Sequence, residues 1–306
     1  MARFLVLALA LAPLAGAMTP SAGCGSATSL PLGALTQHDP ITVNGSDVAR
    51  HFVHFVPADY AGASASPLPL QIWAHGQYGH AMQEAKASKF IDYPIVSIYP
   101  QGLDDAADAD CGTGWNTGPM GHDASTCDKT ASTCCYSSCR TSGACSADSP
   151  PAGAADVGAA CGWASCADDT TFVAAMIETI AAEVCIDLDA VLMSGGSNGG
   201  MLTHAAYQAL PGTFSTVMPV YGLPLQGHNV VPAANARASI LLLHDRSDAV
   251  IPPAGGYAGG WYYESADDVL GTWAALHGCD AASTDVATAF DGGSTNLACS
   301  EWLNCG

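Results

Sequence analysis

The chain has 306 residues, 49% of them hydrophobic, so it is long enough to bury one sizeable core without a second domain. Its 28 acidic residues against 8 basic ones give a net charge of −20. Nucleic-acid binding needs a basic surface, so this balance excludes a nucleic-acid partner. It also argues against anionic membranes and polyanionic ligands. We expect a monomer without a membrane partner.

The N-terminus is typical of a secretory signal peptide. Arg3 supplies a positive charge, residues 4–14 form an apolar run, and Ala15-Gly16-Ala17 offers small residues for cleavage. The run is shorter than the roughly 20 apolar residues that a bilayer-spanning helix needs. We therefore predict a signal peptide at residues 1–17, a single domain at 18–306, and a secreted, extracellular protein.

Thirteen cysteines fit an oxidising compartment, where disulfides persist. Eight of them lie between Cys111 and Cys166. A zinc site is the alternative, since Cys135 and Cys139 have ligand-like spacing, but no paired histidines accompany them, and we predict no metal site. Because the total is odd, at least one thiol lacks a partner within the chain.

The elements after the N-terminal segment alternate between strands and helices. The first is a hairpin, in which 41–43 and 48–55 flank Asn44-Gly45, a strong turn signal that also begins a glycosylation sequon. Apolar runs predict strands at 70–74, 95–99, 191–193, 216–218 and 240–243, and helical periodicity predicts helices at 171–184, 201–210 and 265–276. Apolar strands between helices predict an α/β fold, with a mostly parallel sheet covered on both faces.

Residues 103–166 break this rhythm, since they are rich in Cys, Ser, Asp, Gly and Ala. We interpret them as an insertion held by disulfides instead of a core. It follows a strand, so we expect it near the carboxyl ends of the strands, where open α/β sheets bind ligands. A lid, a substrate platform and a surface decoration all remain open.

The pattern Gly195-Gly196-Ser197-Asn198-Gly199 matches G-x-S-x-G between an apolar strand and a helix. Glycines on both sides allow the tight strand-to-helix turn that raises a nucleophilic serine above the sheet. The alternative is a phosphate-binding loop, which would want a lysine where Met201 stands. The pattern favours Ser197 as a nucleophile.

Acyl transfer also needs donors for the developing oxyanion. One is the backbone N–H of Asn198, directly after the nucleophile. The second usually comes from the loop after an earlier strand, and His75-Gly76-Gln77 follows the 70–74 strand. We therefore predict the Gln77 N–H as the second donor, and we interpret His75 as a structural turn residue.

The catalytic acid should follow a later strand, in the order serine, acid, histidine. The loop after the 240–243 strand carries both Asp245 and Asp248. The residues alone leave both carboxylates open as candidates.

Several motifs in order together resemble the secreted feruloyl esterases and related polyhydroxybutyrate depolymerases, which are similar to carbohydrate esterase family one. They are Gly23-Cys24-Gly25, Tyr99-Pro100-Gln101-Gly102, Asp168-Asp169-x-x-Phe172, Cys185-Ile186-Asp187, Ser194 to Met201 around the serine, and Asp248-x-x-Ile251-Pro252. The resemblance spans roughly residues 23–306 apart from the insertion. It implies the α/β-hydrolase fold, ester hydrolysis through an acyl-enzyme without a cofactor, and Asp248 rather than Asp245 as the acid.

The chain departs from that family at the catalytic histidine, which the family places in a Gly-His loop after the last strand. After Asp248 the chain offers only His277, at the end of a predicted helix. Residues 299–306 resemble the segment just before the family's last strand. We therefore expect no catalytic histidine in this chain and a missing C-terminal strand, with a truncated sequence as the simplest account. The odd cysteine count agrees with this expectation.

The resemblance implies a secreted esterase that acts on neutral feruloyl or acetyl esters of plant or algal polysaccharides. A polyhydroxybutyrate depolymerase is one alternative. Another is an inactive homologue that binds polysaccharide through aromatic side chains, which core packing would equally explain. These aromatic residues are Trp115, Trp163, Trp261, Tyr262 and Tyr263.

Overall fold

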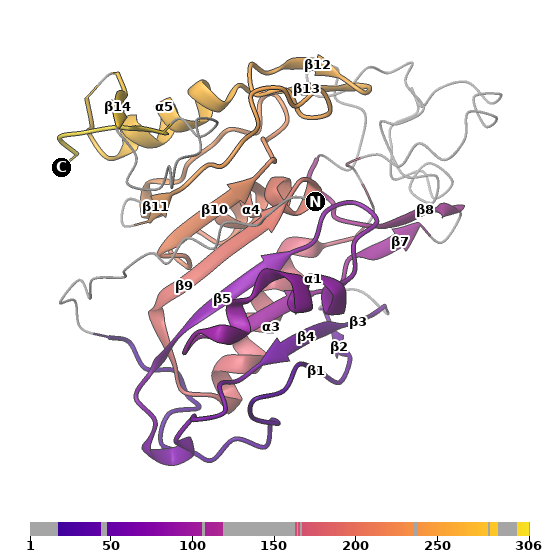
Figure 1. Ribbon diagram of the computed structural model, residues 1–306, viewed down its shortest axis with the longest axis vertical. Helices are drawn as coiled ribbons and strands as arrows, with labels where there is room; N and C mark the ends of the chain where they lie inside the picture. Colours follow the sequence, from indigo (N-terminus) through magenta and orange to yellow (C-terminus); the bar gives the residue numbers. More distant parts are fainter. Residues whose placement is uncertain are drawn as a thin grey trace.

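A computed structural model describes residues 18–43, 48–105, 108–118, 163, 165, 167–235, 238–280, 282–286 and 299–305 (Figure 1). The predicted signal peptide, the sequon turn at Asn44 and most of the predicted insertion lie outside the described residues. The signal peptide, the cleavage site and the nature of the insertion therefore stay predictions.

A seven-stranded sheet crosses the molecule in the order β1-β4-β6-β5-β9-β10-β11 (Figure 1). The pairs β1–β4 and β4–β6 are antiparallel, and the other four pairs are parallel. The strands are β1 (Thr36–Gln37), β4 (Phe52–Phe55), β5 (Leu68–Ala74), β6 (Val96–Pro100), β9 (Ile186–Gly196), β10 (Thr216–Val220) and β11 (Ser239–Ile240).

Helices cover both faces of this sheet. In Figure 1, α1 (Ala81–Ser88) lies in front of the sheet, and α3 (Asp169–Glu183) and α4 (Asn198–Ala209) lie behind it. Successive residues of a strand point to opposite faces. Ile72 of β5 accordingly belongs to the core that holds Met176 and Leu202, whereas its neighbour Trp73 packs with Ala85 of α1. This doubly covered sheet is the α/β-hydrolase fold, as the sequence predicted.

The predicted strands and helices of the sheet are confirmed, with shifts at their ends. β9 begins at Ile186, five residues earlier than predicted, because its first residues pair with Leu68 and Pro20. β11 is shorter than predicted, and only an isolated bridge between Leu243 and Val220 continues its course. The predicted helix at 265–276 is α5 (Ala266–Leu276), which Ser265 caps.

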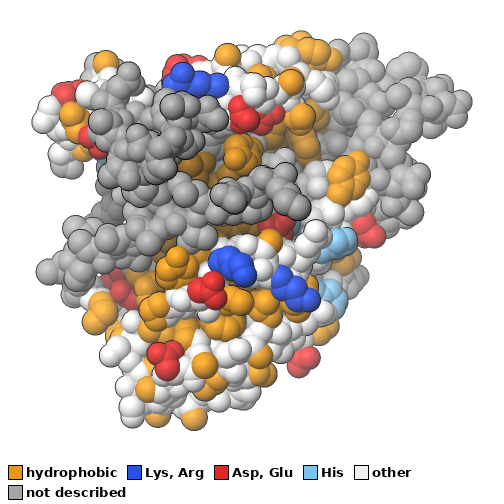
Figure 2. Space-filling view, viewed as in Figure 1, with side chains coloured by type: hydrophobic (Ala, Val, Ile, Leu, Met, Phe, Trp, Pro, Cys, Tyr) orange, Lys and Arg blue, Asp and Glu red, His pale blue; other side chains and the backbone are white. Residues whose placement is uncertain are grey.

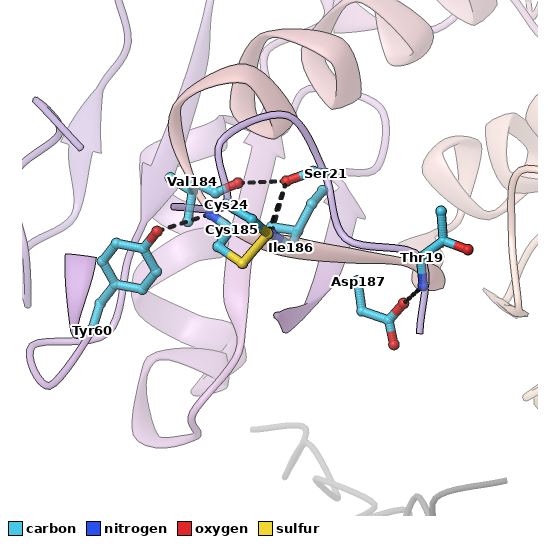
Figure 3. The surroundings of a disulfide bond; sticks show 8 residues. All are labelled: Thr19, Ser21, Cys24, Tyr60, Val184, Cys185, Ile186 and Asp187. Atoms are coloured by element: carbon cyan, nitrogen blue, oxygen red, sulfur yellow. Dashed lines mark hydrogen bonds between the residues drawn. A yellow bond between two sulfur atoms is a disulfide. The ribbon is translucent and has the colours of Figure 1, made fainter. Parts of the chain in front are cut away.

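The N-terminal segment is clamped to the start of β9 (Figure 3). A disulfide joins Cys24 to Cys185, and the Ser21 hydroxyl donates to the carbonyl of Val184 at 2.8 Å. The backbone N–H of Thr19 donates to a carboxylate oxygen of Asp187 at 3.2 Å. These bonds tie the two ends of a long stretch of chain together at the end of the sheet farthest from Ser197.

Several short elements were not predicted. They are β1, α1, the hairpin of β7 (Leu103–Asp105) and β8 (Asp108–Gly114), the ribbon of β12 (Gly256–Ala258) and β13 (Trp261–Tyr263), and the 3-10 turns at Gly62–Ser64, Phe90–Asp92 and Ala233–Asn235. The arms of the predicted hairpin are confirmed, because β2 (Ile41–Thr42) pairs antiparallel with β3 (Ala49–Arg50). The β7–β8 hairpin corrects the expectation that residues 103–166 lack regular structure from their first residue. The hairpin could not be predicted from the sequence because this stretch is polar and shows no apolar strand pattern.

The C-terminal part forms a separate ribbon. β14 (Thr284–Val286) pairs with β15 (Cys299–Glu301) in a two-stranded sheet, and a disulfide joins Cys279 to Cys305. Within the described residues, no strand after β11 joins the central sheet. Within the same residues, no helix has the length and apolarity to cross a bilayer. Basic side chains are few on the face drawn in Figure 2, in keeping with the acidic composition.

Candidate active site

Ser197 occupies a strained turn between β9 and α4. Its backbone has φ 54° and ψ −120°, although a residue with a Cβ rarely adopts a positive φ. The backbone N–H of Ser197 donates to the carbonyl of Val220 at 2.7 Å, and the N–H of Met201 donates to the Ser197 carbonyl at 3.0 Å. The surrounding bonds therefore hold a conformation that an isolated serine would avoid. Such stored strain is typical of functional sites.

The glycines beside Ser197 are required by close backbone contacts. A Cβ on Gly199 would lie 2.2 Å from the carbonyl oxygen of Ala74, so the first turn of α4 presses against the end of β5. A Cβ on Gly76 would lie 3.3 Å from the Cβ of Ser197. The loop after β5 thus passes directly beside the candidate nucleophile.

That loop carries the predicted second oxyanion donor, Gln77. The backbone N–H of Gly79 donates to the Gly76 carbonyl at 2.9 Å, which closes a four-residue turn around Gln77 and Tyr78. Asn198, the first predicted donor, lies in the first turn of α4, where backbone N–H groups have no partner within the helix. The loop that carries Gln77 therefore passes beside Ser197 at Gly76, and Asn198 directly follows Ser197 in the chain.

His75 holds the base of the loop and is neutral at pH 7. The Gly102 N–H donates to its Nε2 at 2.9 Å, so Nε2 carries no proton, and Nδ1 donates to the Gly76 carbonyl at 2.7 Å. Burial lowers the pKa of His75 to about 4, while the bond to Gly76 acts in the opposite direction. Both ring nitrogens are thus occupied by backbone bonds, as expected for a structural residue.

Trp115 links the two oxyanion segments, a role that the sequence did not reveal. The carboxamide oxygen of Asn198 accepts from the Trp115 N–H at 2.7 Å, and its nitrogen donates to the Trp115 carbonyl at 3.3 Å. The indole N–H of Trp115 donates to the His75 carbonyl at 2.6 Å. Trp115 is fully buried, so it cannot stack on a sugar ring. The only signal in the sequence was a tryptophan at the start of the predicted insertion.

The other aromatic residues considered as sugar-binding divide into two groups. Trp261 and Tyr263 are buried, which supports core packing for them, whereas Trp163 and Tyr262 are half-buried. The indole of Trp163 donates to the Tyr263 hydroxyl at 2.6 Å. Trp163 therefore ties the far end of the predicted insertion to the β12–β13 ribbon.

The loop after β11 places the two candidate acids in different surroundings. One carboxylate oxygen of Asp248 accepts from the N–H groups of Val250 and Ile251 at 2.8 and 3.0 Å, and the other lies 3.5 Å from Nε2 of His244. Asp245 is exposed, and its bonds with Ser247 lower the pKa of its carboxyl group. Asp248 is therefore half-buried, with its carboxylate held by two backbone N–H groups, whereas Asp245 lies at the surface.

No described histidine is aimed at Ser197, whose hydroxyl group has no hydrogen-bond partner among the described residues. Nε2 of His244 lies 2.7 Å from the Ile251 carbonyl, so it carries a proton that faces the Asp248 loop. His204 belongs to α4 and is buried, which lowers its pKa to about 4, and its Nε2 bonds to the Gly222 carbonyl at 3.3 Å.

His277 also lies away from the elbow. It stacks on Trp273, which in turn packs against Tyr207. Tyr207 is ten residues after Ser197, or ~15 Å along a helix. The described residues therefore contain the predicted serine, both amides and the acid, but no base beside the serine.

Two exposed tyrosines beside the elbow were also not predicted. Tyr78 follows Gln77 and has φ 64°, and Tyr221 follows β10 and has φ 53°. The Tyr221 N–H donates to the Leu243 carbonyl at 2.8 Å, and its ring lies edge-on to His244. Both conformations are unusual for aromatic residues.

Among the described residues, no group of three or more His, Cys, Asp or Glu side chains could hold a metal ion.

Comparisons with known proteins give only distant likenesses. No protein-family model matches the chain, and no curated protein matches it in sequence. The solved acetyl xylan esterase from Aspergillus awamori is 15% identical, with a TM-score of 0.48 over 88% of this chain and 89% of that one. A thermostable esterase is 16% identical, with a TM-score of 0.43 over 71% of this chain and 48% of that one. The chain thus spans about half the length of the thermostable esterase, and scores this low support no assignment of activity.

Proposed function

We propose that this chain is a serine-type carboxylic ester hydrolase with Ser197 as nucleophile. The observation that carries the proposal is the strained elbow, in which Ser197 has φ 54° between β9 and α4. A purely structural turn would not need a bulkier residue than glycine at a positive φ. The close approach of Gly76 to the Ser197 Cβ adds a second backbone segment at the place where an oxyanion hole belongs.

In the proposed reaction, the Ser197 Oγ attacks the carbonyl carbon of an ester. The carbonyl oxygen becomes an oxyanion that accepts from the N–H groups of Asn198 and Gln77. Collapse of this intermediate breaks the bond to the alcohol oxygen, so that the alcohol leaves with the proton of the Ser197 hydroxyl, and the acyl group left on Ser197 is then hydrolysed by water to the acid, which returns a proton to Ser197. The chemistry needs no cofactor.

Asp248 acts in this proposal as the acid that orients a histidine base. Its two backbone bonds, from the N–H groups of Val250 and Ile251, fix the position of its carboxylate, which is what such an acid needs. None of the described histidines is assigned as the base. Activity without a positioned base rests on the oxyanion donors and is correspondingly slow.

The proposed substrates are feruloyl or acetyl esters of plant or algal polysaccharides. The order of motifs from Gly23 to Pro252 supports this class, and the net charge of −20 favours uncharged over anionic polymers. The disulfides Cys24–Cys185 and Cys279–Cys305 support an extracellular location, because disulfides persist in oxidising compartments. A monomer is proposed, without a nucleic-acid or membrane partner.

A polyhydroxybutyrate depolymerase is the second candidate, since the same motifs occur in that group. Clearing of polymer plates without release of ferulate or acetate would select it. An inactive polysaccharide-binding homologue is the candidate of another class. Polysaccharide retention by a chain that hydrolyses no ester would select that alternative.

The test is hydrolysis of methyl ferulate and 4-nitrophenyl acetate by the wild type and three variants. Ser197→Ala should abolish the enzymatic rate. Where a histidine base accompanies Asp248, Asp248→Asn should lower the rate, while Asp245→Asn, on the same loop, should leave it within a factor of about two to three. Hydrolysis that survives Ser197→Ala would refute the assignment. Equal effects of the two aspartate variants would refute the role of Asp248.

A further inference from the structure

Trp115 lies at the junction of three segments that are distant in sequence. It follows β8, it contacts the end of β5 through His75, and it contacts the start of α4 through Asn198. Its side chain is fully buried, and its ring lies 4.7 Å from the His75 ring, measured between centroids. Hydrogen bonds are directional, so those from Trp115 to His75 and Asn198 fix the orientation of Trp115 as well as its distance from the two segments.

We propose that Trp115 is the positioning residue of the oxyanion hole, an inference that rests on the proposed function of Ser197. The two predicted donors belong to different elements. Gln77 lies on the loop after β5, and Asn198 lies on the first turn of α4. Trp115 bonds to His75, two positions before Gln77, and to the side chain of Asn198. A single buried residue thereby couples the two segments.

The proposed chemistry requires the two oxyanion donors to be placed accurately. Oxyanion donors act when they lie about 2.7–3.1 Å from the position of the negative oxygen. A misplacement of about 1 Å can cost roughly 100-fold in rate. The hydrogen bonds of Trp115 go to His75 and Asn198, so its proposed effect on the donors passes through these two residues.

Trp115 is itself held by the stem of the predicted insertion. The N–H of the next residue, Asn116, donates to a carboxylate oxygen of Asp169 at 2.6 Å, and Asp169 forms a buried ion pair with Arg50. The Thr117 N–H donates to the Trp163 carbonyl at 2.8 Å. The stem is therefore anchored by the two residues that directly follow Trp115, and Trp115 connects it to the segments that carry the predicted donors.

The decisive variant is Trp115→Phe, which keeps an aromatic ring but removes the indole N–H together with part of the ring volume. The matched control is Trp273→Phe, which makes the same change in a buried tryptophan that packs on Tyr207, far along α4 from Ser197. The substrate is 4-nitrophenyl acetate, whose good leaving group needs little acid assistance. The inhibitor is phenylboronic acid, which forms a tetrahedral anion on an active serine.

We expect Trp115→Phe to lower kcat about 10- to 100-fold with KM within threefold. The affinity for phenylboronic acid should fall by a similar factor. Trp273→Phe should change kcat less than threefold, although it should lower the melting temperature to a comparable degree. A change in kcat and boronate affinity without a change in KM is the sign of lost transition-state stabilisation, which a packing defect alone would not produce.

If Trp115→Phe does not fold, Asn198→Asp replaces it, because the carboxylate keeps the acceptor for the Trp115 N–H and loses the donor to its carbonyl. The same losses are expected. Unchanged kcat and boronate affinity in a folded variant, or equal losses in Trp273→Phe, would overturn the inference while leaving Ser197 as nucleophile. Activity that survives Ser197→Ala would instead overturn the proposed function itself.

Discussion

The buried ion pair between Arg50 and Asp169 gives a stability prediction that can be worked from its geometry. A guanidinium nitrogen of Arg50 lies 2.6 Å from a carboxylate oxygen of Asp169, and the two side chains are 3% and 0% exposed. The second carboxylate oxygen accepts from the Asn116 N–H, and the guanidinium lies 4.1 Å from the centre of the Phe172 ring. Water therefore cannot replace either partner.

Replacing Arg50 by Met leaves the Asp169 carboxylate buried with one backbone donor. Breaking a buried pair in this way costs about 3–5 kcal/mol. The double variant Arg50→Met/Asp169→Leu removes both charges and leaves one buried N–H, that of Asn116, without its acceptor, at a cost of about 1–3 kcal/mol. The double variant should therefore be more stable than the single variant.

The assay is urea unfolding at pH 7, followed by tryptophan fluorescence, for the wild type and both variants. Arg246→Met, on an exposed loop, is the matched control and should change the unfolding free energy by less than about 0.5 kcal/mol. A loss below about 1 kcal/mol for Arg50→Met, or a double variant no more stable than the single one, would refute the reasoning.

Three further predictions concern other buried features. Burial lowers the pKa of His75 and of His204 to about 4, so the unfolded chain binds more protons between that value and 6.5. Each neutral ring then contributes on the order of 3 kcal/mol to the free energy of unfolding. This contribution is fully present above pH 6.5 and is lost as pH falls through about 4. Urea unfolding at pH 4.5 and 8 should show this difference, and His204→Gln should reduce it; equal stability at both pH values would contradict it. Cys24→Ser, which removes the disulfide with Cys185 across 161 residues, should cost about 5 kcal/mol by loop entropy, measured as a lower urea midpoint, and an unchanged midpoint would contradict it. Gly199→Ala should cost about 3 kcal/mol in the same assay, with loss of ester hydrolysis, since its Cβ would meet a carbonyl oxygen at 2.2 Å; an active, stable variant would contradict this contact.

The sheet was predictable because its strands are nearly continuous apolar runs. The strand that ends at Ala74 and the one that precedes Ser197 are buried on both faces, so their composition alone separates them from loops. The helix that starts after Ser197 was likewise marked by its glycines and its apolar periodicity. Local pattern and tertiary burial agree in these segments.

The β7–β8 hairpin and α1 were missed for the opposite reason. The hairpin runs through Asp and Gly residues, and its pairing is set by the chain around it instead of by its own β propensity. α1 buries only Ala81 and Ala85, so it shows little helical periodicity. Tertiary contacts decide both elements.

The residues of the candidate site show the same difference between local motifs and tertiary contacts. Ser197, Asn198 and the Asp248 loop could be predicted because each lies in a short local motif. The buried link through Trp115 could not, because it joins residues 40 and 83 positions apart. The surroundings of His244 were hidden in the same way, since its proton is directed by the Ile251 carbonyl in the folded loop.

The most direct test of the central claim is covalent labelling of the folded protein with a fluorophosphonate, followed by peptide mass spectrometry. We expect one adduct per chain, located on Ser197, and no adduct on the Ser197→Ala variant. An adduct on another residue, or labelling of Ser197→Ala equal to that of the wild type, would contradict the assignment of Ser197 as the nucleophile.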